Sequence, residues 1–245
     1  MITTIRSNKM VVISDLHMGN PFSNTTQQVM RFLRWASAQG FDICINGDGL
    51  EMAQASVGKM IHEMPEVIRT AKDVARQGKK IYYIVGNHDM TLEHFLEDWG
   101  PLKVSPFLNI TSGDLRIRVE HGHLYDPFFV AWPRMYEILT HLGGFFLKLS
   151  PNLYRIWIAF EKLRARWRAR TSGIIGEPPQ FKEAAYELSR RGFDVVVFGH
   201  THHTGEVELE NGHRYLNPGS WMLSCHYVEI QDGVATLIVW QDSVA

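Results

Sequence analysis

The feature that most constrains the fold is a set of five short strand-like runs, each followed within two residues by a polar motif. The runs are rich in β-branched residues and only a few residues long, which is typical of buried strands. They cover residues 10–13, 41–45, 80–85, 115–119 and 194–198. The motifs that follow are Asp15-Leu16-His17, Gly47-Asp48-Gly49-Leu50-Glu51, Gly86-Asn87-His88-Asp89, His121-Gly122-His123 and Gly199-His200-Thr201-His202. The sequence therefore predicts five strands that end in clusters of Asp, Asn and His.

Helical periodicity separates the early runs. Residues 24–38 and 62–77 repeat apolar side chains at helical spacing, and Gly40 and Gly78 follow these segments as helix stop signals do. Strands that alternate with helices indicate an α/β sandwich. The C-terminal part differs, because it predicts antiparallel strands at residues 206–209, 212–216, 226–230 and 234–240. The dipeptides Asn211-Gly212 and Asp232-Gly233 supply the hairpin turns between them.

Residues 126–180 break this pattern, because they contain no strand-like run. Asp126-Pro127 and Ser150-Pro151 each offer an N-cap residue followed by a proline at the first helical position. We therefore predict a single domain of residues 1–245 with a helical cap, the cap segment, inserted at residues 126–180.

The second half of the cap segment is aromatic and strongly basic. Residues 148–170 hold seven basic residues and one acidic residue, a local charge of +6 in a chain whose net charge is −1. An apolar helical face most often packs in a core. A basic face beside Trp157 and Trp167 also fits an amphipathic helix at an interface. We expect this helix to contact substrate or a membrane surface.

Composition excludes several other classes of protein. The net charge of −1 gives no general attraction to nucleic acid. Cys44 and Cys225 are the only cysteines, which is too few for a disulfide framework. No signal peptide is visible, and no apolar stretch approaches the ~20 residues that span a bilayer. We therefore expect a cytoplasmic protein.

The five motifs suit a metal site in both position and chemistry. The carboxyl ends of strands in an open α/β sheet are where ligands bind. Asp15 and His17 are two residues apart, so they can leave a strand on the same side and chelate one ion. Asp and His suit Mn²⁺, Zn²⁺, Fe or Co. Six or more ligands with a shared carboxylate indicate two ions roughly 3.5–4 Å apart, the arrangement for in-line displacement at phosphorus.

In this order the five motifs resemble those of the calcineurin-like metallophosphoesterases, and they span Asp15 to His202. The resemblance implies a four-layer α/β/β/α sandwich with a helical cap, and two divalent ions, with Mn²⁺ preferred over Zn²⁺, Fe or Co²⁺. It assigns Asp15, His17 and His202 to the first ion, Asn87, His121 and His200 to the second, and Asp48 to both.

The same resemblance implies a mechanism in which a metal-bound hydroxide attacks phosphorus. His88 would stabilise charge on the phosphoryl oxygens or protonate the leaving oxygen. Asp89 would orient the His88 imidazole. Glu51 is expected to stand behind the ligands rather than to bind a metal.

Within that family, the Asp-Leu-His start, the Gly-Asp-x-x-Glu motif and the inserted helices resemble the UDP-2,3-diacylglucosamine pyrophosphatases of lipid A synthesis. This resemblance implies hydrolysis of a pyrophosphate in a nucleotide-sugar lipid and peripheral contact with the anionic inner face of a membrane. The expected substrate-binding residues are His123, Trp157, Arg164 and Trp167. The chain departs from that group at His88, where many members have arginine, and at His123, where His-Gly-Asp is usual.

Alternative functions remain open at this stage. A general phosphodiesterase or phosphatase acting on another nucleotide or lipid phosphoester would use the same ligands. A nuclease requires a basic groove leading to the metals, but only the cap segment is basic, so no nucleic acid partner is expected. A non-catalytic scaffold would have lost ligands, whereas every ligand position is filled.

The remaining polar residues receive structural predictions. Asn217-Pro218-Gly219-Ser220 is expected to close the sheet near the metals, and His203 either to touch substrate or to fill a motif position. Four further histidines are expected to be solvated on the surface, namely His62, His94, His141 and His213.

Overall fold

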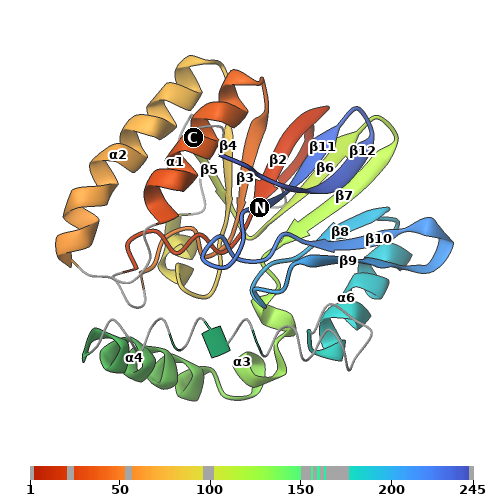
Figure 1. Cartoon of the computed structure of the whole chain (residues 1–245). Coiled ribbons are helices and arrows are strands. Elements are labelled where there is room, and N and C mark those ends of the chain that lie inside the picture. Colours follow the sequence, from red (N-terminus) through yellow and green to blue (C-terminus); the bar gives the residue numbers. More distant parts are fainter. Residues whose placement is uncertain are drawn as a thin grey trace.

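The computed structural model describes residues 3–20, 25–52, 57–95, 102–149, 156, 159–160, 163 and 177–242. Two six-stranded sheets lie face to face, with helices on both outer sides (Figure 1). No helix within these ranges is long and apolar enough to cross a membrane.

The first sheet has the strand order β12-β11-β2-β3-β4-β5. Its parallel strands are β2 (Lys9–Ile13), β3 (Asp42–Asn46), β4 (Ile81–Ile84) and β5 (Leu102–Ser105). The hairpin of β11 (His226–Gln231) and β12 (Val234–Val239) pairs antiparallel with β2. Helices α1 (Thr25–Ala38) and α2 (Val57–Arg76) cover the outer face of this sheet (Figure 1).

The second sheet has the strand order β1-β6-β7-β8-β10-β9. Its strands are β1 (Thr3–Arg6), β6 (Phe107–Ser112), β7 (Leu115–Glu120), β8 (Val195–Val197), β10 (Arg214–Asn217) and β9 (Gly205–Glu208). Helix α6 (Pro179–Arg190) covers its outer face. Short 3₁₀ helices η1 (Met90–Phe95), η2 (His123–Tyr125) and η3 (Glu210–Gly212) lie in the connections.

Three layers of buried apolar side chains separate the four layers of backbone. Val12 of β2 points into the core between the two sheets, while its neighbours Val11 and Ile13 pack in the core that α1 shares. Phe181 of α6 packs against Val196 of β8 in the third core. Strands β2, β4 and β8 are buried on both faces over most of their length, and their sequences are accordingly continuous apolar runs rather than alternating ones. The predicted four-layer α/β/β/α sandwich is confirmed.

The sequence located nine of the twelve described strands and missed three. The five apolar runs, the two N-terminal helices and the four C-terminal strands all form, with ends shifted by a few residues. The missed strands β1, β5 and β6 do not form continuous apolar runs. Strands β1 and β5 lie at sheet edges, so they lack the signal of a strand buried on both faces. Strand β6 alternates half-buried and buried residues.

The described part of the cap segment is helical. It includes α3 (Pro127–Ala131) and α4 (Pro133–Leu149), which lie below the two sheets in Figure 1. As predicted, Asp126 is the N-cap residue of α3, and Pro127 occupies its first turn. Ser150-Pro151 and the predicted substrate-binding residues Trp157, Arg164 and Trp167 lie outside the described residues.

Candidate metal centre

The polar motifs lie in tight loops that directly follow five strands, namely β2, β3, β4, β7 and β8. Five predicted ligands have a positive φ, from 46° to 67°, a conformation that few non-glycine residues adopt. They are Asp15, His17, Asp48, His200 and His202. A Cβ atom at Gly199 would lie 1.9 Å from Ser14 Oγ, and one at Gly86 would lie 2.2 Å from Asp48 Oδ1. The glycines therefore allow these loops to approach one another.

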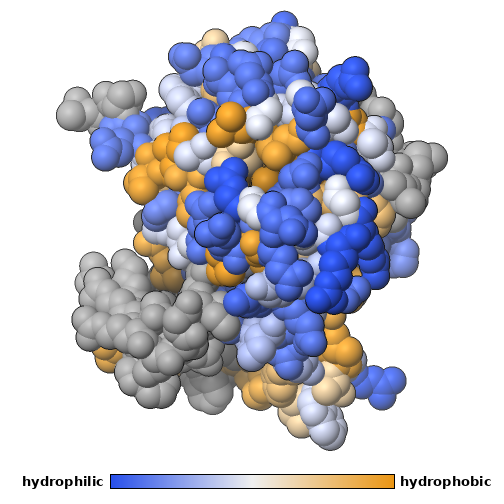
Figure 2. All heavy atoms as spheres, turned by 90° about the vertical axis from the view of Figure 1, so that its right-hand side faces the viewer, coloured by the Kyte–Doolittle hydropathy of each residue, from blue (hydrophilic) through white to orange (hydrophobic). Residues whose placement is uncertain are grey.

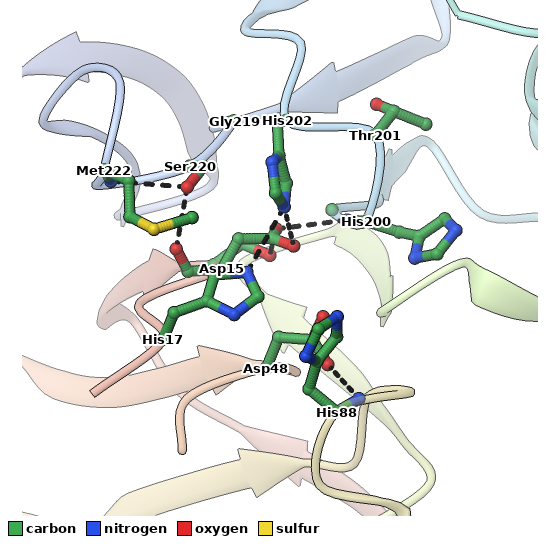
Figure 3. A network of polar contacts seen from close by, with 12 residues as sticks. Asp15, His17, Asp48, His88, His200, Thr201, His202, Gly219, Ser220 and Met222 are labelled. Atoms are coloured by element: carbon green, nitrogen blue, oxygen red, sulfur yellow. Dashed lines mark hydrogen bonds and ion pairs between the residues drawn. The ribbon is translucent and has the colours of Figure 1, made fainter. Parts of the chain in front are cut away.

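Asp15, His17 and His202 form the first cluster of ligand atoms. His202 Nε2 lies 3.3 Å from His17 Nε2 and 3.3 Å from Asp15 Oδ1. Figure 3 shows these three side chains pointing toward one another, with Asp15 and His17 on the loop after β2 and His202 on the loop after β8. Two atoms that each bind one ion at about 2.1 Å lie roughly 3 Å apart, so the spacing suits a shared ion.

Asn87, His121 and His200 form the second cluster. Asn87 Oδ1 lies 2.8 Å from His200 Nδ1 and 3.1 Å from His121 Nε2. Asp48 Oδ2 lies 3.3 Å from His121 Nε2. Asp48 can join His121 and His200 in one group of potential metal ligands, and His17 and His88 in another. The Asp48 carboxylate therefore lies between the two clusters, where a bridging ligand is expected.

The outer ring nitrogen of three of these histidines is held by an oxygen acceptor. His17 Nδ1 lies 2.9 Å from Glu51 Oε2, and His121 Nδ1 lies 2.9 Å from the carbonyl oxygen of Asn46. His200 Nε2 lies 3.0 Å from Asp126 Oδ2. A metal-binding histidine commonly donates its other ring N–H in this way, which fixes the ring and leaves the inner nitrogen free to bind.

The carboxylates supply buried negative charge that suits a cation. Asp15 Oδ2 accepts hydrogen bonds from Ser14 Oγ and the His200 N–H, whereas Asp15 Oδ1, though buried, accepts none of ordinary geometry among the described residues. Burial would raise the pKa values of Asp15 and Asp48, but the neighbouring imidazoles, His121 foremost, hold both below their ordinary range. The oxygen and nitrogen donors therefore fit two divalent ions.

His88 lies beside this array, and Glu51 is its hydrogen-bond partner. His88 Nδ1 lies 2.8 Å from Glu51 Oε1, and the His88 N–H donates to Asp48 Oδ1 at 2.8 Å. Burial lowers the pKa of His88, but Asp48 and Glu51 outweigh burial and raise it to about 9. Glu51 thus forms hydrogen bonds with the Nδ1 atoms of both His17 and His88, as expected of a residue that supports the ligands.

The predicted contact of Asp89 with the His88 ring is wrong. Asp89 instead accepts hydrogen bonds from the backbone N–H groups of Gly49 and Gly86 and from the Tyr83 hydroxyl. Its carboxylate therefore fixes the loops after β3 and β4. The family resemblance implied the pair, but in the structure Glu51 is the hydrogen-bond partner of the His88 ring.

A cavity of about 460 Å³ joins this centre to the cap helices. Asn87 and His88 line one wall, and α3 and α4 line the other. The lining residues are Met52, Asn87, His88, Met90, Thr91, Phe129, Pro133, Arg134, Tyr136, Thr140 and His141. The Tyr136 hydroxyl lies 3.5 Å from Asn87 Nδ2, so the described cap helix reaches the second cluster directly.

Several residues in and near the cavity lie in positions that the sequence did not predict. His141, which was expected to be solvated, is exposed but lines the cavity. His123, an expected substrate contact, is buried with Nδ1 free of hydrogen bonds to the described residues, and its ring packs edge-on against Phe129. Arg134 and Tyr136 carried no sequence signal beyond their place in the cap segment.

The Asn217–Ser220 stretch supports the loops, as predicted. Ser220 Oγ donates to the carbonyl oxygen of Asp15 at 3.0 Å (Figure 3), and Asn217 Nδ2 donates to the carbonyl oxygen of Gly199 at 3.3 Å.

Two packed mixed sheets with Asp, Asn and His at the strand ends form a candidate site for metal ions. A family model described as calcineurin-like phosphoesterase matches residues 9–204. The chain belongs to this family and is a hydrolase that acts on phosphoester bonds. Members of the family use a dinuclear site for divalent metals, and the clusters described above provide candidate ligands for one.

Two similar curated proteins are both UDP-2,3-diacylglucosamine hydrolases. The one from Azotobacter vinelandii is 22% identical over 210 residues, which are 82% of this chain and 84% of that protein. The one from Ectopseudomonas mendocina is 25% identical over 220 residues, 86% of this chain and 89% of that protein. Among solved structures, a dimetal phosphatase from Danio rerio aligns with a TM-score of 0.45 and 11% identity, covering 95% of this chain and 99% of that one.

Proposed function

We propose that this chain hydrolyses the pyrophosphate of a nucleotide-sugar lipid such as UDP-2,3-diacylglucosamine. The observation that carries the proposal is the cavity between the metal centre and α4. His88 and Asn87 form its reactive wall, while Phe129 and Tyr136 offer apolar surface and Arg134 a positive charge. A substrate that joins a diphosphate to an apolar group matches these walls. The names of the two curated relatives support the same substrate.

We further propose Mn²⁺ as the ion at both positions. The proposed ligands are Asp15, His17 and His202 for one ion, Asn87, His121 and His200 for the other, and Asp48 for both. When bound, two such ions would supply a water of lowered pKa as the nucleophile and would neutralise charge on the phosphoryl oxygens.

His88 would complete the reaction centre. Its imidazole lines the cavity and is held by Glu51, so it is positioned to stabilise phosphoryl charge or to give a proton to the leaving oxygen. Arg134 on the opposite wall would bind the second phosphate of a diphosphate substrate.

Exposed apolar side chains on the cap segment support a peripheral location at the inner face of a membrane. Met135, Ile138, Leu139 and Leu142 of α4 are exposed and lie at helical spacing along one side. Phe128, Val130 and Trp132 extend this exposed apolar surface onto α3 and its C-terminal end. Figure 2 shows apolar atoms at the lower end of the molecule, where α3 and α4 lie in Figure 1. Exposed apolar surface of this extent is typical of an interaction surface.

Sedimentation with vesicles tests the membrane location. Ile138→Asp should reduce binding to anionic vesicles because it places a charge on the proposed contact face. Ile68→Asp is the matched control, since Ile68 on α2 has the same exposed fraction of 54%. Equal loss of binding for both variants would contradict a membrane contact through α4.

A substrate panel with Mn²⁺ tests the main proposal. It comprises UDP-diacylglucosamine, a chromogenic phosphodiester, a phosphomonoester and single-stranded DNA. We expect the highest kcat/KM on UDP-diacylglucosamine, with Arg134→Ala lowering it more than it lowers the value on the chromogenic diester. Preference for the simple diester, the monoester or DNA would replace the proposed substrate and leave the reaction class intact.

A further inference from the structure

An acidic residue at each end of the cap segment forms a hydrogen bond with the loop that follows β8. At the N-terminal end, Asp126 Oδ2 lies 3.0 Å from His200 Nε2. At the C-terminal end, Glu177 Oε1 accepts a hydrogen bond of 2.5 Å from Thr201 Oγ1. The two acceptors are 51 positions apart in the sequence, yet they hold consecutive residues of one loop. That loop presents two of the proposed metal ligands, His200 and His202.

Asp126 uses its two carboxylate oxygens for two different tasks. Oδ1 accepts from the backbone N–H groups of Phe128 at 2.8 Å and Phe129 at 3.4 Å, which caps α3. Oδ2 faces His200, whose side chain is only 4% exposed. An N-cap needs a single oxygen, and serine serves as well as aspartate. The second oxygen therefore links the start of the cap helices to the second metal cluster.

Glu177 is more deeply buried than Asp126, and it accepts hydrogen bonds from three neutral side chains. It is 6% exposed and accepts from the Tyr215 hydroxyl at 2.7 and 2.8 Å and from Asn217 Nδ2 at 2.6 Å, in addition to Thr201. Asn217 also lies 3.1 Å from Thr201 Oγ1. This buried network fixes the peptide between His200 and His202 against β10.

We propose that Asp126 and Glu177 are positioning residues that hold the His200–His202 loop from the two ends of the cap segment, so that the order of α3 and the affinity for metal are coupled. The inference rests on the metal centre of the proposed function. A partner that orients a metal-binding histidine commonly contributes about 10–100-fold to metal affinity. Because such coupling is reciprocal, metal binding must also stabilise α3, the helix that Asp126 caps.

Asp126→Ser separates the two tasks of this side chain. Serine retains an oxygen for the N-cap but is too short to reach His200, whereas Asp126→Ala removes both contacts. Metal affinity is measured by equilibrium dialysis against Mn²⁺ with elemental analysis, and the order of α3 by amide hydrogen exchange with and without Mn²⁺. Circular dichroism checks that each variant is folded.

We expect wild-type protein to bind two Mn²⁺ per chain and to show slower exchange across Pro127–Ala131 when they bind. Asp126→Ser should bind one of the two ions about 10–100-fold more weakly, and Mn²⁺ should no longer slow exchange in α3. Glu177→Gln should weaken Mn²⁺ binding as well, whereas Glu183→Gln, on the exposed side of α6, should leave it unchanged.

The outcomes distinguish the inference from the function on which it rests. Wild-type protein that bound no Mn²⁺ would contradict the metal centre, and the inference with it. Two tightly bound ions in wild type, in Asp126→Ser and in Glu177→Gln would overturn the positioning role alone. A loss of affinity in Asp126→Ala but not in Asp126→Ser would assign Asp126 to helix capping and would likewise overturn the proposal.

Discussion

At the residue scale, the site combines unusual backbone with ordinary ligand chemistry. Five predicted ligands have positive φ, and among the described non-glycine residues only Asn211 and Asp232, both in turns, share this conformation. Each such residue costs of order 1 kcal/mol or more, and such strain persists only where the surroundings determine it. Hydrogen bonds such as that from the His200 N–H to Asp15 Oδ2 supply that constraint. These hydrogen bonds therefore stabilise the loops in the conformation that brings the ligand side chains together.

Asp48→Asn tests the carboxylate between the two clusters. The substitution keeps the size of the side chain but removes the negative charge that would attract both ions, so binding of both should weaken by more than about tenfold. Elemental analysis after gel filtration measures the metal content. A variant that retains two ions per chain would contradict the bridging role.

His88→Ala tests the residue beside the ions. Turnover should fall by about 10²–10³ while the metal content stays at the wild-type level, because the group would stabilise charge in the transition state. His62→Ala on the exposed side of α2 is the control. Since His88 can also join His17 and Asp48 as a potential ligand, a fall in metal content would assign it to metal binding instead.

At the element scale, the site depends on where strands and helices end. The ends of β2, β3 and β4 meet on one sheet, while β7 and β8 bring His121 and His200 from the other. Helices α3 and α4 then form the second wall of the cavity. Glu177 lies at the boundary between the cap segment and α6, so it joins this wall to the loop after β8.

Glu177→Gln should change how stability depends on pH. Burial raises the pKa of Glu177 from 4.5 to about 7 in the folded protein, against the hydrogen bonds from Thr201, Tyr215 and Asn217. Between those two values the folded chain binds more protons than the unfolded chain. The contribution of Glu177 to stability is therefore fully present below about pH 4.5 and declines as pH rises through about 7.

Urea unfolding of the metal-free protein at pH 5 and pH 8 measures this effect. The free energy of unfolding of wild type should fall between these values by more than that of Glu177→Gln, which cannot titrate. Parallel changes in the two proteins would contradict a raised pKa for Glu177.

At the scale of the whole molecule, the metal centre spans both sheets, so its geometry depends on how they pack. The core between them holds Val12 and Cys44 from one sheet and Ile117 and Val197 from the other. Interiors packed as densely as this transmit small displacements rather than absorb them. This core fixes the position of one sheet relative to the other, and with it the spacing between the two clusters of ligand atoms.

Ile117→Ala tests that core. Ile117 is fully buried between the sheets, so the substitution should lower the free energy of unfolding by about 2–5 kcal/mol. As a control, Ile68→Ala on the exposed face of α2 should lower the free energy of unfolding by less than about 0.5 kcal/mol. Chemical denaturation followed by circular dichroism measures both, and equal small losses would contradict the packing between the sheets.

The sequence by itself determined the reaction class, because each ligand lies within a few residues of the strand that positions it. A motif such as Gly-Asn-His-Asp needs only the end of β4 to place its side chains, so local pattern is sufficient. The same pattern failed for Asp89, whose neighbour in sequence is not its partner in space. Strands β1 and β5 were missed for a related reason, since these edge strands lack the continuous apolar run of a strand buried on both faces.

Only the tertiary structure decided which groups support the ligands and what faces them. Glu51 reaches His88 across 37 positions, and Asp126 reaches His200 across 74. The cavity combines Asn87 with Tyr136 of a helix about 50 positions away in the chain. Contacts at such separations depend on how the two sheets pack and where the cap helices lie. The long-range packing of the chain sets these positions, and no local spacing of residues encodes them.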